Sequence, residues 1–199
     1  ASLKIRNQRG LLIALAALLA AALAVFFATG VNFFKVTNLL NIAKGFSMLS
    51  IAAIGQTFVI IGGGLDLSVA EVISTANVFA ATFMAGNNAL FLPVTLATLA
   101  MGAVVGLANG LMVTKRNVPA FVATLGTSIV LRGARLMWTQ GLPQGKIPPA
   151  LNRIGIGLTL GIPNLIYTFL VFAVLAWLVL NRMGYGRRLY AVGTNRSVA

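Results

Sequence analysis

Long apolar runs alternate with short polar or glycine-rich breaks along nearly the whole chain. Each run holds about 20 mostly apolar residues, which is the length that an α-helix needs to cross a lipid bilayer. The pattern predicts an all-α, polytopic membrane protein in which about six transmembrane helices form one domain. The predicted spans cover approximately residues 11–29, 45–61, 69–85, 90–114, 119–138 and 162–181, and a cytoplasmic segment follows over residues 182–199.

The first apolar run, Leu11 to Thr29, could also be a signal peptide, because basic residues precede it. It is longer than the usual apolar region of a signal peptide, and no A-x-A cleavage site leads into a soluble domain. Further apolar runs follow instead, so we interpret it as the first transmembrane helix.

The composition agrees with a membrane location. Hydrophobic residues make up 59% of the 199 residues and charged residues 9%, whereas a soluble domain carries about 25% charged residues. A chain this poor in charge is not an ordinary soluble enzyme, a disordered tail or a fibrous protein. It has no His and no Cys, which excludes imidazole catalysis, thiol chemistry, disulfides and metal sites of the His/Cys kind. We expect no cofactor in this chain.

The net charge of +13 would suggest nucleic acid in a soluble protein, but the basic residues follow the predicted membrane topology instead. With a cytoplasmic N-terminus, more of them fall inside than outside, as the positive-inside rule requires. We therefore expect membrane lipid and not nucleic acid as a partner. The inner group is Lys4, Arg6, Arg9, Lys115, Arg116, Arg182, Arg187, Arg188 and Arg196, and the outer group is Lys35, Lys44, Lys146 and Arg153.

One long connection, residues 140–161, is rich in proline and glycine. We expect an ordered outer loop in which a short interfacial helix can form. The chain starts without Met and stops at Ala199 within a polar segment, so we also expect a longer parent protein.

Both acidic residues of the chain belong to the glycine-rich break between the second and third spans, GGGLDLSVAE. The glycines end the second helix, and Ser68 with Glu71 forms the S-x-x-E pattern of a capping box that opens the third. The flanking spans are short and the break has no Lys or Arg, so we expect it to be partly submerged and packed against protein. Asp66 then has two interpretations, a structural turn or a gating and transport role. Asp66 and Glu71 are not a catalytic pair, because five helical residues turn them about 140° apart.

Small and polar residues inside the later spans indicate helix packing or a solute path. Gly102, Gly106 and Gly110 form a stripe that lets another helix approach closely. Asn109 beside the stripe is a candidate interhelical hydrogen-bond donor.

A polar patch near the middle of the fifth span comprises Thr124, Thr127 and Ser128, and it could line a solute path or pack against a helix. Arg132 and Arg135 share one face toward the outer end of the same span. They could snorkel to the interface or serve an outside partner.

The final segment is basic and polar, yet its residues 189–192 are apolar. This pattern fits either a solvated tail or a short amphipathic segment that presses against a cytoplasmic partner.

Four blocks of the chain, in order, resemble the permease subunits of bacterial simple-sugar ABC importers of the ribose, xylose and galactose type. GQTFVIIGGGLDLSV (55–69) resembles the signature of that family. PAFVATLGTSIVLRG (119–133) is similar to its fifth-span block, GRRLYAVGTN (186–195) to its cytoplasmic loop, and NFFKVTNLLNIAK (32–44) to its first outer segment. Gly64 and Ala70 depart from the family pattern, so the geometry of the turn can differ.

The resemblance implies a subunit of the bacterial plasma (inner) membrane that moves a simple sugar into the cytoplasm. It implies a second permease subunit, identical or paired, two cytoplasmic ATPase subunits that bind ATP and Mg²⁺, and a solute-binding protein outside. No Walker A pattern occurs in this chain. By the same resemblance, Arg187, Tyr190, Gly193 and Asn195 belong to the segment that touches the ATPase, and Asp66 and Ser68 to an acidic turn of unassigned task.

Two alternatives remain beside this interpretation. A branched-chain amino-acid ABC permease is a relative, although the acidic GGGLDLS turn favours the sugar type. An ion-coupled secondary carrier usually has several ionisable residues in its spans and internal repeats, and this chain offers few. A membrane-embedded enzyme needs a nucleophile with a base, and the chain has no such pair.

Overall fold

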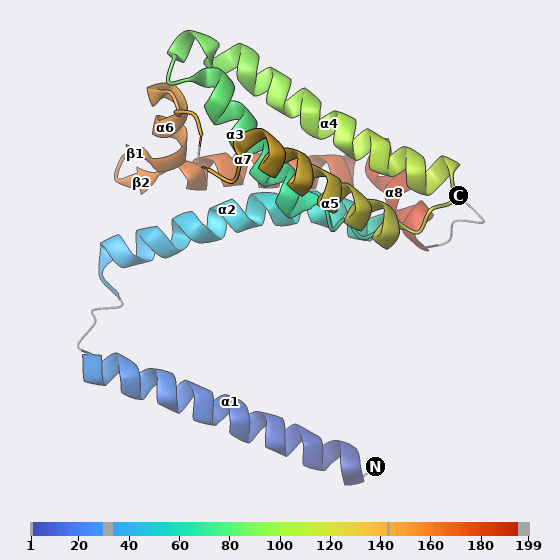
Figure 1. The fold of residues 1–199 in the computed structure, drawn as a ribbon. Coiled ribbons are helices and arrows are strands. Elements are labelled where there is room, and N and C mark those ends of the chain that lie inside the picture. Colours follow the sequence, from blue (N-terminus) through green and yellow to red (C-terminus); the bar gives the residue numbers. More distant parts are fainter. Residues whose placement is uncertain (1, 30–33, 143, 195–199) are drawn as a thin grey trace. The chain divides into compact units, whose positions relative to one another are not determined.

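The computed structural model describes residues 2–29, 34–142 and 144–194, and helices dominate it (Figure 1). The chain divides after Ile42 into two units. The first unit contains α1 (Ser2–Thr29) and the first turns of α2 (Val36–Ile61). The second unit contains the rest of α2 followed by α3 (Val69–Met84), η1 (Asn88–Leu90), α4 (Phe91–Lys115), α5 (Ala120–Thr139), α6 (Pro149–Ile156), β1 (Leu158–Thr159), β2 (Ile162–Pro163), α7 (Asn164–Arg182) and α8 (Gly184–Thr194).

Each predicted span corresponds to one of these helices, which confirms an all-α polytopic membrane architecture. Four helical segments are long and apolar enough to cross a membrane, namely α2, η1 with α4, α5 and α7. The apolar part of α1 (Ile13–Phe27) and α3 are shorter apolar helices. Helix α2 begins at Val36, well before the predicted span, because Lys44 interrupts the hydropathy but not the helix, in which lysine is a favourable residue.

The connection between α5 and α7 contains the expected short helix, α6, and also a small hairpin that the all-α prediction lacked. Strands β1 and β2 pair antiparallel, with Leu158 opposite Pro163. Leu160 and Gly161 both have positive φ, 52° and 77°, as a two-residue hairpin turn requires. Ile162 belongs to β2, and α7 begins at Asn164, two residues after the approximate start predicted for the last span.

Helices α3, α4 and α5 pack against one another, and α7 packs against α6 and α8 (Figure 1). Few side chains of the described residues are buried, and most of these are polar or small. Buried polar residues are Ser47, Ser68, Asn109, Thr124 and Thr139, whereas Met84 and Ala123 are the buried hydrophobic residues in this part of the chain.

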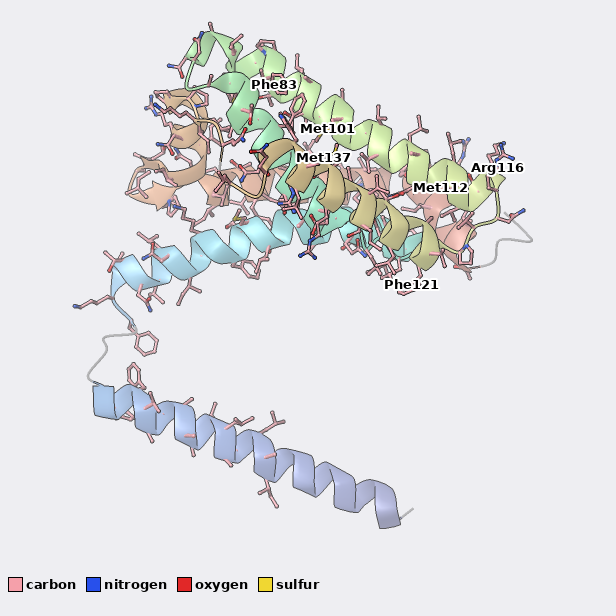
Figure 2. All side chains as sticks on the ribbon, viewed as in Figure 1. Phe83, Met101, Met112, Arg116, Phe121 and Met137 are labelled. Carbon is pink, nitrogen blue, oxygen red and sulfur yellow. The ribbon has the colours of Figure 1, made fainter. Side chains whose placement is uncertain are left out.

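Large apolar side chains lie on the outside instead. On α5, Met137 is 82% exposed and Phe121 is 53% exposed, and Figure 2 shows both on this helix among the many side chains that project outward. A water-soluble fold would hide such residues. An interior that is polar and an exterior that is apolar suit lipid or neighbouring transmembrane helices as surroundings.

Candidate functional site

The candidate site is centred on the turn that joins α2 to α3. Helix α2 ends at Ile61, and Gly63 adopts a left-handed φ of 76°, as glycine allows at a helix end. The Gly64 N–H donates to the Val59 carbonyl over 2.9 Å, which closes the helix end. The predicted end of α2 in the glycine run is confirmed.

Asp66 and Ser68 are bonded to each other within this turn. One carboxylate oxygen of Asp66, Oδ1, accepts from the backbone N–H of Ser68 over 2.7 Å and from its hydroxyl over 2.6 Å. Ser68 is completely buried. Its side chain makes no capping bond to α3, so the predicted capping box was wrong, because Asp66 already takes the hydroxyl proton. Asp66 has at least a structural role in the turn.

Asn109 of α4 connects the turn to α5. Its Nδ2 donates to Ser68 Oγ over 3.1 Å, and its Oδ1 accepts from the Thr127 hydroxyl over 2.6 Å. Asn109 is 5% exposed. Asn109 is thus a hydrogen-bond donor, as predicted, but it donates to Ser68 in the turn, whereas toward the helix α5 it accepts.

Thr124 of α5 holds the turn from the other side. Its hydroxyl accepts from the Leu67 N–H over 3.1 Å and donates to the Ala120 carbonyl over 2.8 Å. The hydroxyls of Thr124 and Thr127 thus take part in packing of the turn, while Ser128 is half-buried on the same helix. A role of these three residues in a solute path stays a prediction.

Glu71 forms an ion pair with Arg135 of α5 and takes no part in capping. Arg135 Nη2 lies 2.6 Å from Glu71 Oε2, and the two side chains are 22% and 19% exposed. Arg135 therefore points to α3, so the snorkelling interpretation was wrong for it, whereas Arg132 is exposed. Sequence reasoning missed this pair. The available signal was one acidic residue in the third predicted span and two basic residues, Arg132 and Arg135, in the fifth, since such residues pair where they can.

A groove of about 720 Å³ opens beside the turn. Its walls come from the end of α2, the turn itself, the last turns of α4, the start of α5 and the inner face of α8. Asp66, Asn109 and Thr124 give this groove a polar side, and Leu189 gives it an apolar one.

The glycine stripe of α4 lies partly along this groove and is open. A Cβ built on Gly102, Gly106 or Gly110 would meet no atom within 4 Å. In the described part of the chain, no helix therefore packs closely on the stripe, and the predicted packing remains a prediction.

The segment after α7 forms the helix α8, which is packed on the end of α2 and is not a solvated tail. A Cβ built on Gly62 would lie 3.2 Å from Leu189 Cδ1, and one on Gly193 would overlap the Ile61 carbonyl oxygen. Gly193 thus permits close helix contact within the chain.

Two of the other predicted coupling residues are exposed, as Gly193 is. Arg187 is exposed, and Tyr190 is 48% exposed. Asn195 lies outside the described residues.

Comparisons with known proteins now place the chain in a family. Residues 38–199 match the family model described as "Branched-chain amino acid transport system / permease component". The chain is 35% identical over 170 residues to the ribose import permease protein RbsC of Escherichia coli (strain K12), a match that covers 83% of this chain and 53% of that protein. It is 32% identical over 170 residues to RbsC of Bacillus subtilis (strain 168), covering 84% and 52%.

The autoinducer 2 import system permease protein LsrC of Salmonella paratyphi B (strain ATCC BAA-1250 / SPB7) is 36% identical over 166 residues, covering 82% of this chain and 47% of that protein. The chain spans about half the length of the curated relatives that it matches. No solved structure matches the chain. The match to the family model covers most of the chain and includes the turn, its partners on α4 and α5, and α8. The chain is a multi-pass membrane protein and belongs to the family of permease components of branched-chain amino acid transport systems.

Proposed function

We propose that this chain is part of a permease subunit of a bacterial ABC importer that carries a monosaccharide into the cytoplasm. The identity to the ribose import permease proteins of Escherichia coli and Bacillus subtilis, 35% and 32%, carries the proposal. The family description names branched-chain amino acids, but these more specific relatives favour a sugar over an amino acid.

In this proposal the subunit supplies the path and the mechanical linkage, and partner ATPase subunits bind ATP and Mg²⁺ and hydrolyse the ATP. The chain itself uses no cofactor. A second permease subunit, identical or different, and a solute-binding protein outside complete the importer. The complex lies in the plasma (inner) membrane with the N-terminus of this chain in the cytoplasm, which the distribution of basic residues supports.

Helix α8 is the proposed contact with the ATPase. One side of this helix packs on the end of α2 through Leu189 and Gly193. Arg187 and Tyr190 are exposed. A helix with one side held by its own chain and another side free suits a docking element. We extend the contact to Asn195 by resemblance alone.

The first test is co-purification and transport with the full-length protein. We expect a gentle detergent pull-down to retain an ATPase subunit and a solute-binding protein, and cells to take up ¹⁴C-D-ribose in a way that survives a protonophore but fails when ATP is depleted. Uptake that follows the proton gradient would indicate a secondary carrier. ATP-driven uptake of ¹⁴C-leucine instead of ribose would indicate the amino-acid alternative.

The contact with the ATPase has its own test. Tyr190→Asp introduces a charge into the exposed face of α8 and should abolish co-purification of the ATPase, while Tyr190→Phe keeps the ring and should retain it. Normal ATPase binding and normal uptake in the Tyr190→Asp variant would show that Tyr190 is not part of the contact.

A further inference from the structure

Helix α3 presents one polar face to α5. Ser68, Glu71, Thr75 and Thr82 fall within about 60° of one another around the helix axis, because their spacing follows the helical repeat. The ion pair between Glu71 and Arg135 shows that this face meets α5. Together with Thr124 and Arg135 of α5, these four residues are called the polar seam below. The part of the seam on α3 is about 21 Å long, at 1.5 Å per residue.

The inner half of the polar seam is satisfied by hydrogen bonds. Ser68 bonds to Asp66 and Asn109, and Thr124 bonds to the backbone of Leu67 and of its own helix. This half behaves as packed protein interior, in which buried polar groups have partners.

The outer half of the polar seam differs in this respect. Thr75 Oγ1, Thr82 Oγ1 and Arg135 Nε are buried and have no hydrogen-bond partner. Among the described residues one further buried side-chain atom shares this property, Oε1 of Gln56 on α2. Three of the four such atoms thus gather between the same two helices.

The hydroxyls of Thr75 and Thr82 differ in their hydrogen bonding from those of other helical threonines in this chain. A threonine inside a helix commonly donates its hydroxyl to the carbonyl four residues earlier, as Thr57, Thr95 and Thr98 do over 2.8, 2.6 and 2.7 Å. Thr75 and Thr82 do not use this bond although their helix offers it. Their hydroxyls are free to bond to a group that enters the seam.

The outer loop closes over the end of the seam. The Lys146 N–H donates to the Ala81 carbonyl over 2.9 Å, and a Cβ on Gly145 would overlap the backbone of Ala81 and Thr82. The Gln144 amide donates to the carbonyl of Thr139 at the outer end of α5. The loop thus lies against the end of α3 beside Thr82 and against the end of α5.

Three aromatic rings lie close to this outer end. The ring centroids of Phe79 and Phe83 are 4.5 Å apart, and Trp138 lies 6.4 Å and 5.8 Å from them. Phe79 and Phe83 belong to α3 and Trp138 to α5, so the rings bridge the same two helices that form the seam.

We propose that the outer half of the polar seam is hydrated and binds the hydroxyl groups of an uncharged, polyhydroxylated solute during transport. Thr75 and Thr82 each offer a donor and acceptor, and Arg135 offers its Nε–H. Glu71 neutralises Arg135, so the seam has no surplus charge that would favour an ion. Unpartnered polar atoms at membrane depth are tolerated where they line a water-filled space, and a sugar hydroxyl replaces water there without loss of hydrogen bonds. This inference rests on the proposed function, since it names where the sugar bonds.

Hydration is tested first, by cysteine labelling in the membrane. The chain has no Cys, so Thr75→Cys, Thr82→Cys and the control Leu99→Cys each introduce one thiol into the full-length protein, after replacement of any cysteine elsewhere in it by alanine. Leu99 is an apolar residue of α4 whose side chain is 65% exposed. The probe is 2-aminoethyl methanethiosulfonate, which reacts with thiolates that water reaches.

We expect Thr75→Cys and Thr82→Cys to react at least tenfold faster than Leu99→Cys, and D-ribose to slow them but not the control. Rates equal to that of Leu99→Cys would overturn the inference, because the seam would be dry. Fast labelling that no monosaccharide slows would also overturn it, because the seam would then hold only water.

Binding is tested by removal of the two hydroxyls. The double variant Thr75→Val/Thr82→Val should raise the KM of ATP-driven ¹⁴C-D-ribose uptake about tenfold with unchanged abundance in the membrane. The matched control Thr98→Val loses a hydroxyl that is already bonded within its helix and should transport normally, and Thr75→Ser/Thr82→Ser should restore the KM. Unchanged uptake in the valine variant would overturn the inference. If the unmodified importer carries no sugar with ATP, the proposed function fails instead, and the labelling rates still decide whether the seam is hydrated.

Discussion

The ion pair between Glu71 and Arg135 should stabilise the packing of α3 on α5. The two charges belong to residues that are 64 positions apart in the chain, and Nη2 and Oε2 lie 2.6 Å from each other. Glu71→Gln leaves the guanidinium without its counterion inside the apolar region, and Arg135→Gln leaves the carboxylate. Either change removes one partner of the ion pair, while the desolvation penalty of the remaining charge is no longer offset by its partner.

The expected loss of stability follows from the geometry and the burial. Removal of one partner of a buried ion pair costs about 3–5 kcal/mol, and two unit charges about 4 Å apart attract by about 4 kcal/mol at an effective dielectric constant of about 20. The side chains are 22% and 19% exposed, so the lower end of the range applies. We expect each single variant to lower the free energy of unfolding by about 3 kcal/mol.

The assay is a double-mutant cycle on the full-length protein, unfolded by SDS in mixed micelles. Glu71→Gln/Arg135→Gln removes both charges at once, so it should cost no more than either single variant and deviate from additivity by at least about 2 kcal/mol. Arg132→Gln is the matched control, because Arg132 lies on the same helix but is exposed, and it should leave stability unchanged. Additive effects of the two single variants would refute the pairing, and so would an unaltered Glu71→Gln.

Two further predictions concern the ends of the turn. Thr124→Val should cost about 1–2 kcal/mol of unfolding free energy, because it leaves the partly buried Leu67 N–H without its acceptor. Thr124→Ser keeps the oxygen and should be stable, and equal stability of all three proteins would contradict the assignment. Gly193→Ala should displace α8 from α2, because its Cβ overlaps the Ile61 carbonyl oxygen, at a cost of about 1–3 kcal/mol. Limited proteolysis should then cleave after α7 faster than in the parent protein, whereas an unchanged digest would show that α8 is held elsewhere.

The helices could be predicted from the sequence because their signal is local. An apolar run of about 20 residues between breaks indicates a membrane helix wherever its neighbours lie. The same holds for the end of α2, since Gly63 takes a left-handed conformation that other residues rarely adopt. The apolar run predicted as the second span starts at residue 45, after Lys44, whereas α2 itself begins at Val36 and continues through this lysine.

The partners of the polar side chains could not be predicted in the same way. Ser68 and Glu71 have the spacing of a capping box, but Ser68 donates to Asp66, two residues earlier, and both residues also have partners on other helices. The hydroxyl of Ser68 donates to Asp66 and accepts from Asn109. The Glu71 carboxylate forms an ion pair with Arg135. The partner of Glu71 lies on α5, and the local spacing of residues in α3 carries no information about that helix. The last segment forms the helix α8, and its apolar Leu189 contacts this chain's own α2. The expected contact of this segment with a cytoplasmic partner stays a prediction.

The contacts around the turn form one continuous path from α8 to α5, and this limits how the parts can move. A displacement of α8 acts first on Ile61 and Gly62, where Gly193 and Leu189 touch α2. The turn that follows is bonded to α4 through Asn109 and to α5 through Thr124. It therefore cannot absorb the displacement by bending freely. Either α3, α4 and α5 move with α8 as one group, or the hydrogen bonds of Ser68 and Leu67 break. Since the bond between Asn109 and Ser68 is buried, the others are partly buried, and such bonds are costly to lose without replacement, a movement of the packed helices as a group is the less costly response.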